Sequence, residues 1–298
     1  MFNSEPLHYR YRVFRPPAEA DSLIIQVAYG CPHNHCRFCG MYKGTPYAVR
    51  PWAEVHEELQ RAARKLHDTR RVFLADGDVM HLPFSALRQM LADLSALFPS
   101  LARVNLYANG GSILAKSDAE LRELRQLKLQ TLYLGLESGA DEMLRQQGKT
   151  ETVDEMVLAV QRAQAQGLRL SVMVLLGFGG QAGSARQAEA TANAVNRMQP
   201  RLLSALRLVP IPGTPLQRLV DEGRFKPLTE YETVVELHAM IRDFELDGTI
   251  FRANHVSNAL PLEARFPKDK AQALALLCQA LQADRLDRNS PGPMPFSL

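Results

Sequence analysis

Several features are scarce in this sequence of 298 residues: it has four cysteines, one tryptophan and no long apolar run. So few thiols exclude the dense disulfide framework of small secreted domains. A membrane-spanning helix needs about 20 consecutive apolar residues, which no stretch provides, so we expect no membrane partner. Because no basic segment followed by an apolar run opens the chain, we also expect no secretory signal and a cytoplasmic location.

Charge of one sign is scarce as well. The chain has 35 Lys and Arg against 32 Asp and Glu, a formal net charge of +3, with no long run of either sign. A net charge this small does not indicate a nucleic-acid binder. Nucleic acid is possible as a partner, but the charge does not favour it. With 46% hydrophobic and 22% charged residues, the composition is typical of a globular protein with a sizeable core.

What the chain does contain is a regular alternation of short apolar runs and amphipathic stretches. The runs predict strands at 23–29, 72–75, 104–108, 131–136, 170–176 and 202–209, and the stretches predict helices at 53–66, 84–98, 118–127, 153–166 and 185–198. Successive parallel strands need crossover helices, and right-handed crossovers curl such a series. The sequence therefore predicts an α/β fold, a partial (β/α)6 barrel of parallel strands. Periodicity alone leaves a doubly wound open sheet as the alternative.

Three predicted helices begin with the Ser/Thr-x-x-Glu capping box, in which a hydroxyl and a carboxylate each satisfy a backbone N–H. These pairs are Ser117 with Glu120, Thr152 with Glu155, and Thr229 with Glu232. Their positions support the predicted helix boundaries.

Three of the four cysteines lie within nine positions, in the stretch YGCPHNHCRFCGMYKG after the first predicted strand: Cys31, Cys36 and Cys39. In a cytosolic chain this C-x4-C-x2-C spacing favours metal binding. Structural zinc needs a fourth ligand, from His33, His35 or the distant Cys278. We expect both histidines to be solvated loop residues and Cys278 to be buried on an apolar helix face. Three cysteines without a fourth fit a 4Fe–4S cluster with one open iron. A zinc-bound, non-catalytic module is the alternative of another class.

Polar and glycine-rich segments follow the other predicted strands, and active sites of α/β folds collect at these carboxyl ends. The segments are Asp76–Gly77–Asp78, Asn109 to Ser112, Glu137–Ser138, Gly177 to Gly180, and Pro210 to Pro215. Each alone is explained by a turn or a glycine-rich loop, or for Glu137 by an ion pair. Their convergence with the thiols on one edge of the sheet predicts an active site.

Together these residues resemble the radical S-adenosylmethionine (SAM) superfamily, from about the first predicted strand to the sixth. The resemblance is carried by the cysteine loop with Phe38 before its last cysteine, by DGD where the family often has Gly-Gly-Glu, and by GLESG and PIPGTPL. It is closest to the branch with the Elongator catalytic subunit, the methylthiotransferases and the anaerobic coproporphyrinogen dehydrogenases. This chain departs from the family pattern in two places. Between Cys31 and Cys36 it has one residue more than the family's commonest spacing, C-x3-C-x2-C. Asp78 has a shorter side chain than the glutamate of Gly-Gly-Glu.

The resemblance implies an enzyme, an oxidoreductase or transferase, in which Cys31, Cys36 and Cys39 hold a 4Fe–4S cluster. One electron would cleave SAM to methionine and a 5′-deoxyadenosyl radical. The cofactors, not the side chains of the protein, would carry out this radical-forming step. Implied partners are an electron donor such as flavodoxin or ferredoxin and an unidentified, small or nucleotide-like substrate. A tRNA- or protein-modifying enzyme is the alternative. The residues expected to bind SAM are Phe38, Asp76, Gly77, Asp78, Asn109, Glu137, Ser138, Gly177 and Pro210.

The tail carries a further candidate site. We expect an N-terminal extension at 1–22, the family core at 23–215, and a helical extension at 216–298 with a short strand at 249–251 and a last helix at 268–287. Five polar side chains follow that strand: Arg252, Asn254, His255, Ser257 and Asn258. They form either a surface loop or a loop turned toward the barrel's open end. In the second case Arg252 would hold an anionic group of the substrate, and His255 would bind it or move a proton.

Overall fold

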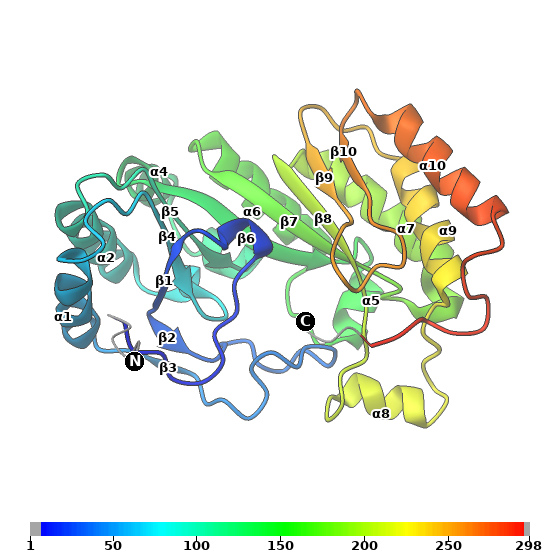
Figure 1. The fold of residues 1–298 in the computed structure, drawn as a ribbon, viewed down its shortest axis with the longest axis horizontal. Coiled ribbons are helices and arrows are strands. Elements are labelled where there is room, and N and C mark those ends of the chain that lie inside the picture. The colour runs from blue at the N-terminus through cyan, green and yellow to red at the C-terminus, as the bar shows by residue number, and fades with distance from the viewer. Residues whose placement is uncertain (1–6, 295–298) are drawn as a thin grey trace. The chain divides into compact units, whose positions relative to one another are not determined.

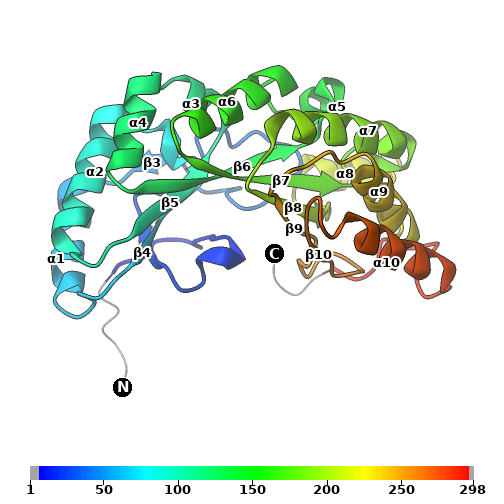
Figure 2. The same cartoon turned by 90° about the horizontal axis from the view of Figure 1, so that it is seen from above.

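A computed structural model describes residues 7–294, in which strands alternate with helices along the chain (Figures 1 and 2). The main sheet has eight strands in the order β1-β4-β5-β6-β7-β8-β9-β10, and β2 and β3 form a separate pair. The chain divides into two compact units. Unit 1 consists of Met1–Asn34, Met41–Leu134 and Arg162–Arg169, and unit 2 of His35–Gly40, Gly135–Gln161 and Leu170–Leu298.

In the main sheet the strands of unit 1 are parallel: β1 pairs with β4, β4 with β5, and β5 with β6, whereas the separate pair β2 and β3 is antiparallel. Helices cover one face of β4 and β5, as Figure 2 shows. Phe73, Ala75 and Tyr133 form a buried cluster, and residues 72–75 of β4 are all buried, so both faces of this strand are covered. Because both faces are covered, these strands are apolar almost throughout rather than alternating. The elements are β1 (Leu23–Gln26), β4 (Arg71–Ala75), β5 (Arg103–Ala108), β6 (Leu129–Glu137), α1 (Trp52–Ala63), α2 (Phe84–Leu97) and α4 (Asp118–Gln126).

Short elements connect these strands and helices. They are the 3-10 helices η1 (Pro17–Glu19) and η2 (Val79–His81), the strands β2 (Ala28–Tyr29) and β3 (Ala48–Val49), and the helix α3 (Gly110–Leu114). Two of them matter for the site, because η2 follows the loop after β4 and α3 follows β5 directly. Both therefore start where a parallel strand ends.

Unit 2 continues the pattern. β7 pairs with β8 and β8 with β9 in parallel, and β10 closes this edge antiparallel to β9. Helix α7 contacts α9, and α9 contacts α10. The elements are α5 (Asp141–Gln146), α6 (Val153–Ala165), β7 (Arg169–Leu176), α7 (Gly180–Met198), β8 (Leu202–Arg207), α8 (Pro215–Asp221), α9 (Glu230–Arg242), β9 (Ile250–Arg252), β10 (Glu263–Arg265) and α10 (Lys270–Gln282).

The predicted α/β fold with parallel strands is confirmed, with differences in detail. The first apolar run is split into β1 and β2, α7 begins five residues earlier than predicted, and α10 ends five residues sooner. All three capping boxes are present. The antiparallel strand β10 was not predicted, because three residues are too short for an alternating pattern. None of the helices among residues 7–294 is long and apolar enough to cross a membrane.

The expectation that Cys278 is buried is wrong. Its side chain is exposed on α10, with Sγ 3.3 Å from Nε2 of His238. The helix is apolar on more than one face, but only Ala273 and Leu277 are buried there, and the neighbouring Leu276 stays 46% exposed. The apolar run around this cysteine was therefore not evidence of its burial.

Candidate cluster and cofactor site

The first cysteine packs directly against the DGD loop within unit 1. A Cβ on Gly77 would overlap Cβ of Cys31 and lie 2.8 Å from its Sγ. Gly77 N also donates a hydrogen bond to Gly30 O at 3.0 Å. Gly77 is therefore required by this close approach and not only by a turn. Cys31 and the loop that follows β4 are therefore packed tightly against each other.

Asp76 starts this loop in a conformation that is rare for a residue with a side chain. Its φ is +94°, in the left-handed region, and such strain persists where surrounding contacts hold it, often at functional sites. Its Oδ2 accepts a hydrogen bond from Nε2 of Gln26 at 2.7 Å. Burial raises the pKa of Asp76 to about 6, against the opposing hydrogen bonds from Gln26 and Tyr42. Its role is thus at least partly to fix the loop to β1.

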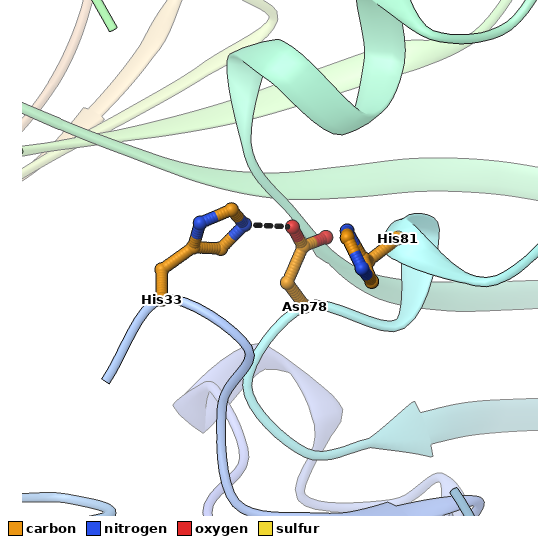
Figure 3. Close-up of side chains that lie close together, drawn as sticks. All are labelled: His33, Asp78 and His81. Carbon is orange, nitrogen blue, oxygen red and sulfur yellow. Dashed lines mark hydrogen bonds and ion pairs between the residues drawn. The ribbon is translucent and has the colours of Figure 1, made fainter. Parts of the chain in front are cut away.

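Asp78, like Asp76, has one buried carboxylate oxygen without a hydrogen-bond partner among the described residues. Its Oδ2 accepts a hydrogen bond from the Ser112 hydroxyl and lies 3.0 Å from Nε2 of His33. Its Oδ1 is buried and has no hydrogen-bond partner among the described residues. Figure 3 shows the carboxylate between His33 and His81, and the ligand atoms of these three side chains lie within 4.8 Å of one another. His33 lies in a loop as expected, but its side chain is only 27% exposed and contacts Asp78, which was not predicted.

Asn109 contributes to the site indirectly, by capping helix α3. Its side chain accepts a hydrogen bond from Gly110 N at 3.0 Å and so caps the first turn of this helix. The capped turn presents Ser112 to Asp78. Asn109 therefore belongs to the same network as the DGD loop, as a residue that positions a hydrogen-bond donor.

The second half of the cysteine loop lies in unit 2 and is held by backbone contacts. Arg37 N donates to Gln147 O at 2.8 Å, and Leu216 N donates to Arg37 O at 3.1 Å. A Cβ on Gly40 would lie 2.7 Å from Cγ2 of Ile211, so this position also needs glycine. The segment that carries Cys36 and Cys39 is thus anchored between the end of α5 and the start of α8.

Phe38 lies within this segment. Its ring meets the ring of Phe178 edge to face, with centroids 5.2 Å apart. Phe178 is almost fully buried and directly follows Gly177 at the end of β7. The contact links the cysteine segment to the loop after β7 within unit 2, an arrangement typical of aromatic pairs.

Glu137 ends β6 with φ at +65°, a second strained position at a strand end. Its Oε1 lies 3.6 Å from Nζ of Lys149, which also donates to Gly135 O. Burial raises the pKa of Glu137, and the charge of Lys149 opposes this rise. A Cβ on Gly135 would overlap Oε1 of Glu137, so glycine makes room for the folded-back side chain. Glu137 does form an ion pair, one of the two roles considered for it.

Ser138 is fully buried, and its hydroxyl is used inside the protein. It donates to Oε1 of Gln187 and accepts from Ala140 N at 3.0 Å, so it stabilises the turn that leads into α5. Pro210 lies half-buried in the loop after β8.

Gly177 is held by a residue that the sequence patterns did not reveal. Its φ is +81°, and its N–H donates to Oε1 of Glu236 at 2.7 Å, while the hydroxyl of Ser184 donates to Oε2 at 2.5 Å. Burial raises the pKa of Glu236 to about 7, against these two hydrogen bonds. The signal for this role of Glu236 in the sequence is weak: it is a glutamate among the apolar positions of the helix that begins after Thr229.

The polar tail segment is organised around Arg207 at the end of β8. Asn258 Oδ1 accepts from Arg207 N at 2.8 Å, and Ser257 O accepts from its Nε at 2.5 Å. The guanidinium also donates to the carbonyls of Pro291 and Pro293. Part of this segment thus has a structural role, joining β8 to the C-terminal residues.

The two residues predicted to contact substrate differ in their surroundings. The Arg252 side chain on β9 is 45% exposed, with Nε 4.0 Å from Oε1 of Glu263 on β10. Nδ1 of His255 lies 2.8 Å from the Ser257 hydroxyl, and burial lowers the pKa of His255. Arg252 therefore keeps much of its hydrogen-bonding capacity, and His255 is held in one orientation.

The residues present fit a SAM-bound iron–sulfur cluster. Cysteine thiolates are the usual ligands of such clusters, and three are available. The buried Oδ1 of Asp78, which has no partner among the described residues, suits a cationic group such as an ammonium. The tight packing of Gly77 on Cys31 holds the residue before Asp78 against the first cysteine.

Comparison with known proteins agrees with this arrangement. Residues 25–187, more than half of the chain, match the model of the radical SAM superfamily, and the chain belongs to that family. A curated relative, 4′-phospho-dehydrooxetanocin synthase of Priestia megaterium, is 20% identical over 168 residues, which are 51% of this chain and 23% of that protein. This chain therefore spans less than a quarter of its relative's length.

Two solved structures share the fold. The radical SAM methyltransferase TsrM from Kitasatospora setae, with cobalamin and a 4Fe–4S cluster bound, has a TM-score of 0.56 and 18% identity, over 68% of this chain and 39% of that chain. Elp3 of Methanocaldococcus infernus has a TM-score of 0.54 and 12% identity, over 90% of this chain and 64% of that one. The fold is thus of the same kind as the partial barrels of radical SAM enzymes. The family match thus shows membership of the radical SAM superfamily, and the solved structures show the shared fold.

Proposed function

We propose that Cys31, Cys36 and Cys39 hold the cluster and that the DGD loop receives the methionine end of SAM. The observation that carries this proposal is the packing of Gly77 on Cys31, which leaves no space for a side chain. When bound, the cluster and SAM supply a one-electron cleavage that starts radical chemistry. The protein's own contribution is to bind, orient and exclude water.

The acceptor for the SAM ammonium in this proposal is Asp78, through its buried Oδ1. The charge-assisted hydrogen bond from an ammonium to a carboxylate is stronger than a neutral one, so a single buried oxygen contributes substantially to binding. Asp76 and Gly77 would contribute backbone acceptors, and Oδ2 of Asp76 is already engaged with Gln26.

Unit 2 supplies the remaining proposed contacts. Phe38 would pack near the adenine, Glu137 would accept from the ribose hydroxyls, and Gly177 and Pro210 would shape the adenine pocket through their backbone. The strained Glu137 and the glycine at Gly177 support this, because strain and positive φ cluster at ligand sites. In this assignment Ser138 and Asn109 position the turns beside these groups.

The reaction itself is proposed only as a class: hydrogen abstraction from an unidentified substrate, small or nucleotide-like, in the cytoplasm. Arg252 is the proposed contact for an anionic group of the substrate, since its guanidinium is 45% exposed. His255 would hydrogen-bond the substrate or move a proton. A flavodoxin or ferredoxin would deliver the electron. A tRNA or protein substrate is the alternative, which the net charge of +3 does not favour for nucleic acid.

Anaerobic reconstitution with iron and sulfide tests the proposal. We expect a brown protein with about four irons per chain that cleaves SAM when reduced. Cys31→Ala, Cys36→Ala and Cys39→Ala should each lose the cluster, whereas Cys278→Ala, at an exposed position on α10, should keep it. A colourless protein with one zinc, or loss of iron only in Cys278→Ala, contradicts the proposal.

A further inference from the structure

The two departures of this chain from the family pattern meet in the structure. One is the extra residue in the cysteine loop, and the other is the short carboxylate of Asp78. His33, which lies in the enlarged part of the loop, reaches Asp78 with its Nε2 3.0 Å from Oδ2 (Figure 3). We propose that His33 is a positioning residue that orients Asp78 toward the SAM ammonium, and so compensates for the missing methylene. This inference rests on the proposed binding of SAM at the DGD loop.

The need for such a residue follows from the side chain itself. An aspartate side chain is about 1.5 Å shorter than that of a glutamate. It has one rotatable bond fewer, so its carboxylate can reach fewer positions. The terminal torsion of aspartate is broad, and rotation about it exchanges the two oxygens. A carboxylate that must offer one defined oxygen to a ligand therefore needs contacts that fix this rotation.

His33 and Ser112 supply these contacts from two directions. Both meet the same oxygen, Oδ2, since the Ser112 hydroxyl donates to it and His33 lies within hydrogen-bond distance of it. Oδ1 is thereby left as the oxygen without a partner among the described residues. The side chain of Asp78 is 2% exposed and that of His33 is 27% exposed, so the contact is largely shielded from water. Pre-organised acceptors of this kind bind more tightly, because less ordering remains to be done on binding.

His81 provides the contrast within the same close-up. Its ring lies near the carboxylate, and a His–Asp–His group could also hold a divalent metal ion. Yet in the described part of the chain no hydrogen bond joins His81 to Asp78, and its ring meets those of His33 and Tyr47 edge to face, with centroids 5.8 and 6.2 Å apart. A positioning role therefore requires His33 and not His81, whereas a metal site would require both.

The test measures SAM affinity of the reconstituted protein by calorimetry, with iron content as a second readout. His33→Leu should weaken SAM binding about tenfold, and His33→Gln, which keeps a donor near the place of Nε2, should restore most of it. The matched control His81→Ala should bind SAM like the wild type. Equal weakening in His33→Leu and His33→Gln, or a similar loss in His81→Ala, overturns the positioning role.

A double-variant cycle tests the compensation itself. In the Asp78→Glu background the longer carboxylate no longer depends on the histidine, so His33→Leu should cost less than twofold there. A tenfold loss in both backgrounds shows that His33 acts on something other than the carboxylate, and overturns the inference. Asp78→Ala separates the two proposals: if it leaves SAM affinity unchanged, the proposed binding at the DGD loop fails, whereas a loss in Asp78→Ala without one in His33→Leu refutes the role of His33 alone.

Discussion

The buried carboxylate of Asp78 in unit 1 differs from those of Glu137 and Glu236 in unit 2. In unit 1, Asp78 keeps one buried oxygen without a partner among the described residues. In unit 2, Glu137 pairs with Lys149, and both oxygens of Glu236 accept hydrogen bonds from the protein. A buried acceptor without a partner costs free energy unless a ligand satisfies it. The difference indicates that Asp78 has an oxygen available for a ligand, whereas Glu137 and Glu236 already bind groups of the protein.

The largest effect should come from the close approach in unit 1. Gly77→Ala places a Cβ against Cys31, where both backbone and side chain are in the way, so we expect loss of the cluster and destabilisation by about 3 kcal/mol. Iron content and urea unfolding measure it. Gly44→Ala is the control: its φ is +78° with open space around it, so it should lose about 1 kcal/mol and keep its iron. Full iron in Gly77→Ala would show that the packing is not needed for the cluster.

Glu236 in unit 2 should make stability depend on pH. Burial raises its pKa to about 7 from 4.5, so the fold favours the neutral carboxyl. This contribution is fully present below pH 4.5 and is lost as pH rises through about 7, up to about 3 kcal/mol. Glu236→Gln should therefore match the wild type near pH 5 and be more stable at pH 8, as judged by urea unfolding.

A matched substitution keeps that test specific. Glu222→Gln changes an exposed glutamate that pairs with Arg224, and it should shift stability by less than about 0.5 kcal/mol at both pH values. A difference between Glu236→Gln and the wild type that is the same at pH 5 and pH 8 would rule out titration of this carboxyl.

Comparing Asp78→Ala with Glu137→Ala tests the contrast between the units directly. Loss of a charge-assisted hydrogen bond raises a dissociation constant roughly tenfold to hundredfold. Asp78→Ala should show this loss of SAM affinity with its iron retained. Glu137→Ala should lose affinity and also stability, since Lys149 would be left without its carboxylate. Should SAM affinity stay unchanged in both, the two carboxylates have structural roles only.

The smallest effect on stability is expected at Arg252. Its contact with Glu263 is 4.0 Å long and exposed, so Arg252→Ala should change the unfolding free energy by less than about 0.5 kcal/mol. Glu263→Ala removes the same ion pair and serves as the control. If Arg252 binds substrate, only Arg252→Ala should lose turnover while both keep SAM cleavage. Equal turnover in the two variants would show that Arg252 is a surface residue that does not bind substrate.

Much of this protein could be predicted from local patterns. The strand–helix alternation, the capping boxes and the C-x4-C-x2-C spacing each involve residues a few positions apart, and the chemistry of thiolates narrows the metal. The prediction for Cys278 was wrong, and the contact of His33 with Asp78 was not predicted, for a common reason. A loop or an apolar run does not reveal what packs on it from a distant part of the chain.

The fold class and the family are encoded locally, because backbone periodicity and motif spacing act over short stretches of chain. Tertiary structure alone decides which polar groups meet: His33 reaches Asp78 across 45 positions, and Glu236 reaches Gly177 across 59. It also decides why Gly77 must be a glycine, since the atoms that exclude a side chain belong to Cys31. Such contacts depend on close packing in three dimensions, for which a linear sequence has no periodic signal.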